Sequence, residues 1–140
     1  MVSSDNVLRA GLTTKHIDPE GLVHCLEEGT SRAARVEPKV FNHSTDVFSP
    51  SADFALSVTQ SSLADPAGVV LPASGPRLLV CTGGEIALVN QSDGDILRLR
   101  RGDAAYADDS DGEVRVIGTG EVAQAFVPSG DDLGQLFDLI

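Results

Sequence analysis

From residue 54 onward the sequence alternates with a period of two and is interrupted at regular intervals by turn signals. Residues 54–59 have the alternation typical of a half-buried strand, with Phe54, Leu56 and Val58 as the apolar set. Segments rich in Val, Leu and Ile indicate further strands at residues 77–81, 85–90, 95–100, 113–117 and 122–127. The expected turns lie at Gly83-Gly84, Asp93-Gly94, Gly102-Asp103, Asp111-Gly112 and residues 118–120. No helical pattern separates these strands, so the sequence predicts an all-β antiparallel sandwich rather than parallel βαβ units.

The alternation also predicts which side chains face the core. Leu97 and Leu99 are expected to point inward, with Arg98 and Arg100 pointing to solvent. An acidic run is expected around an exposed hairpin, and it consists of Asp108, Asp109, Asp111 and Glu113. Its spacing does not fit a calcium-binding loop, so we interpret it as a solvated turn.

One short helix is expected before the strands. Asp18 is a capping residue, Pro19 suits the first helical position, and Gly29 ends the pattern. Residues 30–53 contain two prolines and many polar residues without sustained periodicity, which predicts an irregular connector. Residues 131–140 form a tail in which apolar side chains share one helical face, although the segment is too short for an independent helix.

Composition limits the classes of function. The 140 residues suffice for one domain with its own core, and they carry a formal net charge of −11. Because binding to nucleic acid depends largely on Lys and Arg, this charge makes a DNA or RNA partner improbable. The sequence has no signal-peptide pattern and no apolar run long enough to span a bilayer, so we expect a soluble, cytoplasmic protein with no membrane partner.

Polar residues concentrate in the first sixteen positions. Arg9 and Lys15 could form a local positive pocket for a small phosphorylated substrate, because Arg supplies a planar fork and Lys a mobile charge. The alternative is that these charges are solvated or cap the start of the chain, which is the commoner role of such residues.

Residues 1–15, with the sequence MVSSDNVLRAGLTTK, closely resemble the SDNxxRAGxTPK signature of type I mannose-6-phosphate isomerases. The resemblance continues through residues 53–57, 77–81, Gly84-Glu85 and 99–107, so that it extends over most of residues 1–130. Thr14 stands where the family usually has proline, which loosens the backbone there without removing a reactive group.

This resemblance implies a fold and an activity. Residues 31–130 would form a cupin-like jelly roll, and residues 1–30 would be a remnant of the catalytic domain that carries the signature and the short helix. The activity would be zinc-dependent interconversion of mannose 6-phosphate and fructose 6-phosphate through an enediol(ate), with the metal orienting sugar oxygens. Arg9 would stabilise the enediolate, Asp5 would transfer a proton or orient the substrate, and Lys15 would contact an anionic group.

The family's zinc ligands are a Gln, two His and a Glu, and all of them precede the signature. Met1 aligns with a methionine inside the family sequence, so the chain resembles the C-terminal portion of a longer isomerase. His16, His24 and His43 are the only imidazoles, and their spacing does not predict a shared metal site, so we assign no metal ligand. We therefore expect no zinc on this chain alone and no activity without the missing amino-terminal portion as a partner.

Two hypotheses follow from the resemblance. In the first, Arg9 and Asp5 contribute to an active site that the amino-terminal portion completes, with a small phosphorylated sugar as substrate. In the second, the chain is a noncatalytic cupin-like remnant that binds a ligand or another protein. Loss of a larger domain also predicts exposed apolar side chains, which we expect near Val7, Leu8, Leu12 and the helix.

Overall fold

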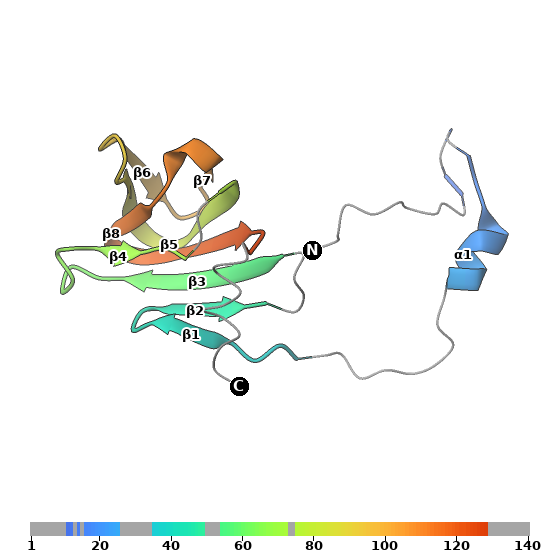
Figure 1. The fold of residues 1–140 in the computed structure, drawn as a ribbon, viewed down its shortest axis with the longest axis horizontal. Helices are drawn as coiled ribbons and strands as arrows, with labels where there is room; N and C mark the ends of the chain where they lie inside the picture. Colours follow the sequence, from blue (N-terminus) through green and yellow to red (C-terminus); the bar gives the residue numbers. More distant parts are fainter. Residues whose placement is uncertain are drawn as a thin grey trace. The chain divides into compact units, whose positions relative to one another are not determined.

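The computed structural model describes residues 11, 12, 14, 16–25, 35–49, 54–72 and 75–128. The chain divides into two compact units, Met1–Arg35 and Val36–Ile140. The second unit is built almost entirely of antiparallel strands, which confirms the predicted all-β class (Figure 1).

The predicted helix is present in the first unit as α1, Pro19–Cys25. Asp18 caps it: the Gly21 amide donates to Asp18 Oδ1 at 2.9 Å, and the Leu22 amide donates to the Asp18 carbonyl at 3.1 Å. The side-chain bond satisfies an amide of the first turn that has no backbone partner, and the second bond is the first backbone bond of the helix. Within the described residues, no helix has the length and apolar character needed to cross a membrane.

The second unit contains one antiparallel sheet of eight strands and a 3-10 helix, η1, at Asp109–Asp111. The strands are β1 Lys39–Asn42, β2 Thr45–Phe48, β3 Ala55–Ser61, β4 Val69–Val70, β5 Arg77–Asn90, β6 Ile96–Arg100, β7 Ala104–Ala107 and β8 Val114–Phe126.

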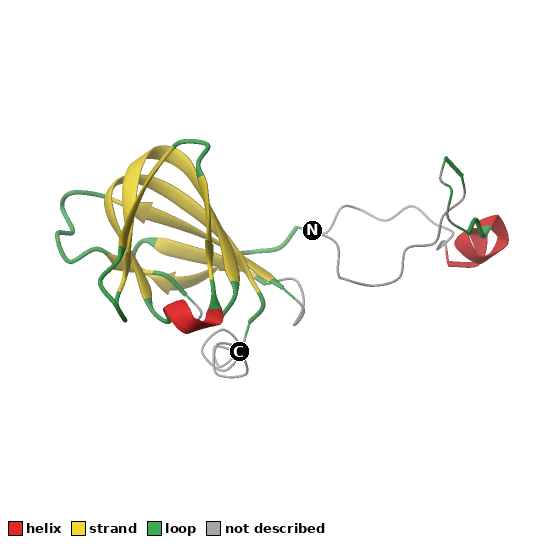
Figure 2. Cartoon of the chain, turned by 90° about the horizontal axis from the view of Figure 1, so that it is seen from above, coloured by secondary structure: helices red, strands yellow, loops and turns green. Residues whose placement is uncertain are grey.

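The two long strands, β5 and β8, pair with each other along their whole length and organise the sheet. The first part of β5 pairs with β7 and the later part with β6, while β8 pairs with β4 near its start and with β3 near its end. Buried side chains from both parts of β5 and β8 join one hydrophobic core, so the sheet folds over itself (Figure 2). This arrangement gives the layered, cupin-like sandwich that the sequence predicts.

The expected turns at residues 83–84 and 118–120 instead lie inside β5 and β8, which corrects the prediction from sequence. Gly84 pairs with Gly120, next to a bulge between Cys81 and Gly83. A Cβ on Gly84 would come 2.7 Å from the Gly120 Cα and closer still to the Thr119 carbonyl oxygen. The two backbones can approach this closely only because neither residue has a side chain.

Residues 30–53 are less irregular than predicted, because β1 and β2 form a hairpin within them. Asn42 explains the tight turn: its Oδ1 accepts the Ser44 amide at 2.9 Å, which is a local side-chain turn that the composition alone does not locate. The hairpin is short, and this is why its alternation did not stand out in the sequence.

The expected orientation of β3 is wrong. On β3 the smaller residues Ala55, Ser57 and Thr59 are buried, and Leu56 and Val58 lie on the opposite face. On β6 the expected face is correct, because Leu99 is buried and Arg98 and Arg100 are exposed, although Leu97 near the start of the strand is 51% exposed. In β3 the period-two alternation is confirmed, whereas the choice of face depends on the neighbouring strands.

Candidate functional site

The residues assigned to the site from sequence lie outside the described part of the chain. This applies to Asp5, Arg9 and Lys15, and also to Val7 and Leu8 in the expected apolar surface. Leu12 and Val23 are described, and both are highly exposed. The site roles of Asp5, Arg9 and Lys15 therefore stay predictions.

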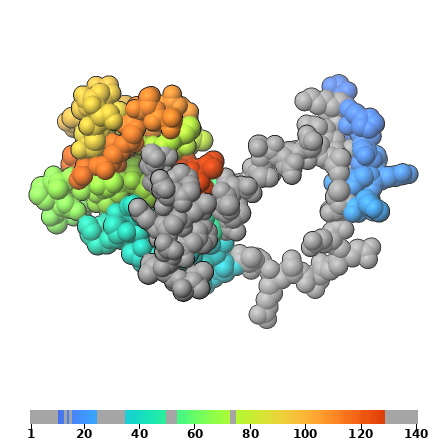
Figure 3. Space-filling view, viewed as in Figure 1, coloured from blue at the N-terminus to red at the C-terminus, as the bar shows by residue number. Residues whose placement is uncertain are grey.

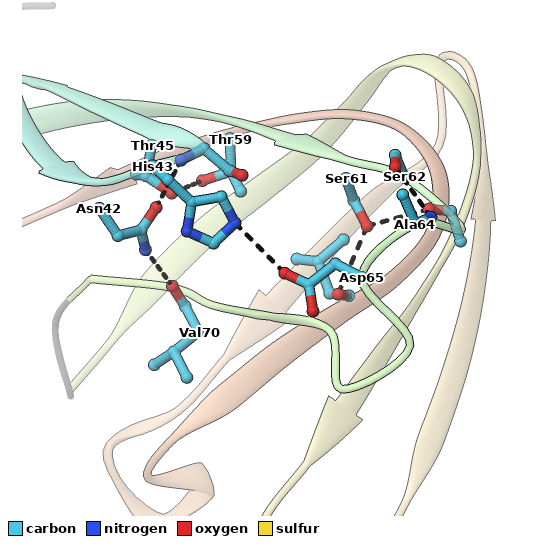
Figure 4. A network of polar contacts seen from close by, with 12 residues as sticks. Asn42, His43, Thr45, Thr59, Ser61, Ser62, Ala64, Asp65 and Val70 are labelled. Carbon is cyan, nitrogen blue, oxygen red and sulfur yellow. Dashed lines mark hydrogen bonds and ion pairs between the residues drawn. The ribbon is translucent and has the colours of Figure 1, made fainter.

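The three histidines occupy separate places. His16 precedes α1 and His24 lies in its last turn, and both are exposed. His43 lies in the β1–β2 turn, where its Nε2 is 3.3 Å from Asp65 Oδ2 (Figure 4). Nowhere in the described ranges do three or more His, Cys, Asp or Glu side chains gather as a metal site requires.

His43 and Asp65 border a hollow of about 640 Å³, which we call the His43 hollow. Two of its hydroxyl groups are engaged in structural hydrogen bonds: Ser61 Oγ donates to the Gly118 carbonyl at 3.0 Å, and Ser62 Oγ accepts the Ala64 amide at 3.0 Å. Figure 4 shows Ser61 and Ser62 apart from the imidazole, with Asp65 between them in this view. Neither of these two hydroxyls is paired with His43, so neither is activated as a nucleophile by this imidazole.

A second hollow, which we call the apolar hollow, measures about 380 Å³. Its buried apolar lining comes from Leu79, Leu88, Ala107 and Val114. Its polar lining comes from Asn90, Asp93, Asp95 and Asp111, and Tyr106 of β7 also borders it.

The polar edge of the apolar hollow is held by hydrogen bonds between the β5–β6 turn and η1. Asn90 Nδ2 donates to Asp111 Oδ1 at 3.1 Å, and Ser92 Oγ donates to the Asp111 carbonyl at 3.2 Å. The atoms of this turn and of η1 lie side by side at one end of the unit (yellow and orange, Figure 3). Partial desolvation, together with the Asp108 carboxylate, raises the pKa of the Tyr106 phenol.

Neither hollow is lined by Lys or Arg. A sugar phosphate carries a dianionic group, and proteins usually bind such groups with Arg, Lys or helix-terminal amides. The two hollows therefore do not have the chemistry of a sugar-phosphate site, and the acidic edge of the apolar hollow would repel such a ligand.

Arg77, which the sequence does not single out, is buried at the start of β5. Its Nη1 donates to the Gly75 carbonyl at 2.7 Å and its Nη2 donates to the Gly112 carbonyl. Burial lowers the pKa of Arg77, and the negative charge of Asp111 opposes this effect. Arg77 and Leu79 are two positions apart in an alternating strand and therefore share a face, which is the sequence pattern that indicates an inward Arg77.

Replacing Arg77 with methionine should lower the free energy of unfolding by about 2 to 4 kcal/mol, because two carbonyl groups would lose charged donors. Urea denaturation measures this loss. Arg98→Met, which removes the same group from an exposed position on β6, should change the free energy by less than about 0.5 kcal/mol. Equal midpoints for wild type and Arg77→Met would show that the guanidinium is not holding η1.

Solved structures of one enzyme are similar to this chain. A lysine-to-alanine variant of phosphomannose isomerase from Salmonella typhimurium matches with a TM-score of 0.67 and 31% identity, covering 89% of this chain and 32% of its own. Mannose 6-phosphate isomerase from the same organism, bound to fructose 6-phosphate and zinc, matches with a TM-score of 0.66 and 31% identity, covering 88% and 31%. A zinc-bound mannose 6-phosphate isomerase gives the same values.

The chain thus spans about a third of the length of these neighbours. No protein-family model matches the sequence, and no curated protein matches it closely. The neighbours support the family resemblance seen in the sequence and agree with the cupin-like all-β class.

Proposed function

We propose that this chain supplies the C-terminal part of a mannose-6-phosphate isomerase and is inactive by itself. The complete enzyme would interconvert mannose 6-phosphate and fructose 6-phosphate by moving a proton between C1 and C2 through an enediol(ate). The observation that carries the proposal is 31% identity, over 88% of this chain, to an isomerase structure that holds fructose 6-phosphate and zinc.

Three residues of the signature segment would act on the substrate. Arg9 would stabilise the negative charge of the enediolate, Asp5 would transfer a proton or orient the sugar, and Lys15 would contact an anionic group. The absence of Lys and Arg from the linings of both hollows supports a site at this cationic segment, because a phosphorylated sugar needs cationic partners.

The dependence on another polypeptide portion follows from the metal chemistry. The neighbours include zinc-bound enzymes, and the described residues of this chain do not gather a set of zinc ligands. The ligands would come from the remaining part of an isomerase about three times as long as this chain.

An assay with zinc and mannose 6-phosphate tests the proposal. We expect no turnover by the 140-residue chain alone, and turnover when the amino-terminal two thirds of the Salmonella enzyme is added. Turnover by the chain alone would refute the claim of dependence. Inactivity of the mixture, with both parts folded by circular dichroism, would refute the isomerase function.

The second candidate is a noncatalytic binding module. It is favoured by one observation, the apolar hollow of about 380 Å³ within the β-rich unit, which is large enough for a small ligand. An inactive mixture that still binds a small molecule at this hollow would support the binding module over the isomerase.

A further inference from the structure

The outer face of the sheet carries two apolar rows that cross four strands. In the first row the register pairs Leu56 with Ala125, Ala125 with Leu78, and Leu78 with Tyr106. In the second row, Val58, Ala123, Val80 and Ala104 pair in the same order. We call these eight residues the outer apolar face.

These side chains point away from the core. Leu78 is 59% exposed, Tyr106 is 61% exposed and Val80 is 40% exposed, while their sequence neighbours Leu79 and Cys81 are fully buried. An antiparallel sheet with one solvated face normally carries polar residues on that face. Eight apolar residues in register, without a charge among them, are instead typical of a surface that another protein covers.

The face has defined borders. A polar row follows the second apolar row, where Gln60 and Thr82 both donate hydrogen bonds to the Glu121 carboxylate. On β2 Asp46 borders the second row beside Val58, whereas Phe48 extends the first row beside Leu56. At the opposite edge, Asp108 accepts a hydrogen bond from the Tyr106 hydroxyl at 3.3 Å. An apolar centre with a polar border is the usual anatomy of a protein interface.

Two observations bear on what covers this face. The chain carries a net charge of −11, so a second copy would be repelled as it approached. The structural neighbours are about three times as long as this chain, so an isomerase of their length has about two thirds of its polypeptide available as a partner.

We propose that the outer apolar face docks the remaining portion of the isomerase polypeptide, through a complementary apolar surface on that portion. This inference rests on the proposed function for the identity of the partner. Leu78 and Val80 lie on the central strand β5 and would be covered at the middle of the contact, where single substitutions weaken binding most.

Calorimetry with the full 140-residue chain and the amino-terminal two thirds of the Salmonella enzyme tests the proposal. Leu78→Glu and Val80→Lys change the net charge in opposite directions, and each should raise the Kd about tenfold or more because each places a charge in an apolar contact. Arg98→Gln, which changes the charge by the same amount as Leu78→Glu at an exposed position on β6, should leave the Kd within about twofold. Thermal unfolding checks that all variants fold.

Each other outcome contradicts a specific part of the proposal. Equal affinities for all variants, or no binding by the wild-type chain, would overturn the docking face. Self-association that Leu78→Glu abolishes would assign the face to a second copy instead. If every variant restores turnover equally, the docking role of the face is wrong but the isomerase function stands. If binding depends on the face but no turnover appears, the docking role stands and the isomerase function is wrong.

Discussion

Replacing Arg9 with alanine is expected to lower kcat of the complemented enzyme by about 10² to 10³-fold, with little change in the assembly of the two parts. The expected size follows from the role proposed for the guanidinium, since removing one group that stabilises a developing oxyanion costs about 2.7 to 4 kcal/mol. A fixed cation contributes mainly when the enediolate forms, so kcat should fall more than KM rises.

The control for this experiment is Arg98→Ala, which removes the same side chain from the exposed surface of β6. It should leave kcat unchanged within about twofold. A mixture in which Arg9→Ala retains wild-type turnover would show that the signature arginine does not act on the reacting sugar, even if the enzyme is an isomerase.

Replacing Gly84 with alanine is expected to lower the free energy of unfolding by about 3 to 5 kcal/mol, measured by urea denaturation. Two effects add here. The residue has a φ of +71°, and its new Cβ would press on the backbone of Thr119 and Gly120 in the paired strand. Neither contact lies at the flexible end of a side chain, so the two central strands would have to separate.

Gly94 provides a matched control, because its φ is +80° and a Cβ there would meet nothing within 4 Å. Gly94→Ala should cost only the backbone strain, about 1 to 2 kcal/mol. Gly120→Ala tests the opposite combination: its Cβ would lie 2.9 Å from Ile86 Cγ2 and closer to the Gly83 carbonyl oxygen, and no left-handed φ is involved. If all three variants lose equal stability, close approach of the strands is not the reason for these glycines.

The class of fold could be predicted because period-two alternation and short turns depend on local sequence. Asp93-Gly94 and Gly102-Asp103 do lie between strands, as expected. Gly83-Gly84 also looks like a turn, but it continues β5 because its partner on β8 is equally free of side chains. That information lies 36 residues away in the register of Gly84 with Gly120, and no local pattern contains it.

Faces were harder to predict than strands. Leu56 and Val58 are the most apolar residues of β3, yet they lie on the outer face, and the core takes Ser57 and Thr59 instead. Thr59 is accommodated because its hydroxyl is 3.0 Å from the Thr45 hydroxyl on β2. A hydrogen bond between two buried hydroxyls avoids the cost of burying a polar group without a partner, so these residues need not face solvent.

The candidate site is predicted from the signature segment alone. The described residues contribute only the observation that neither hollow is lined by Lys or Arg. The hollows of the β-rich unit were not foreseen, because their walls come from segments distant in sequence, such as Leu88 and Ala107. The buried Arg77 was likewise missed, since a cation at the start of a strand usually faces solvent.

The continuity of β5 and β8 through both parts of the sheet has a consequence for how the β-rich unit comes apart. The paired strands β5 and β8 lie in the middle of both parts of the sheet. One part therefore cannot unfold without breaking backbone hydrogen bonds between these two strands. The two parts that share β5 and β8 should therefore lose their native structure together, in a single cooperative step.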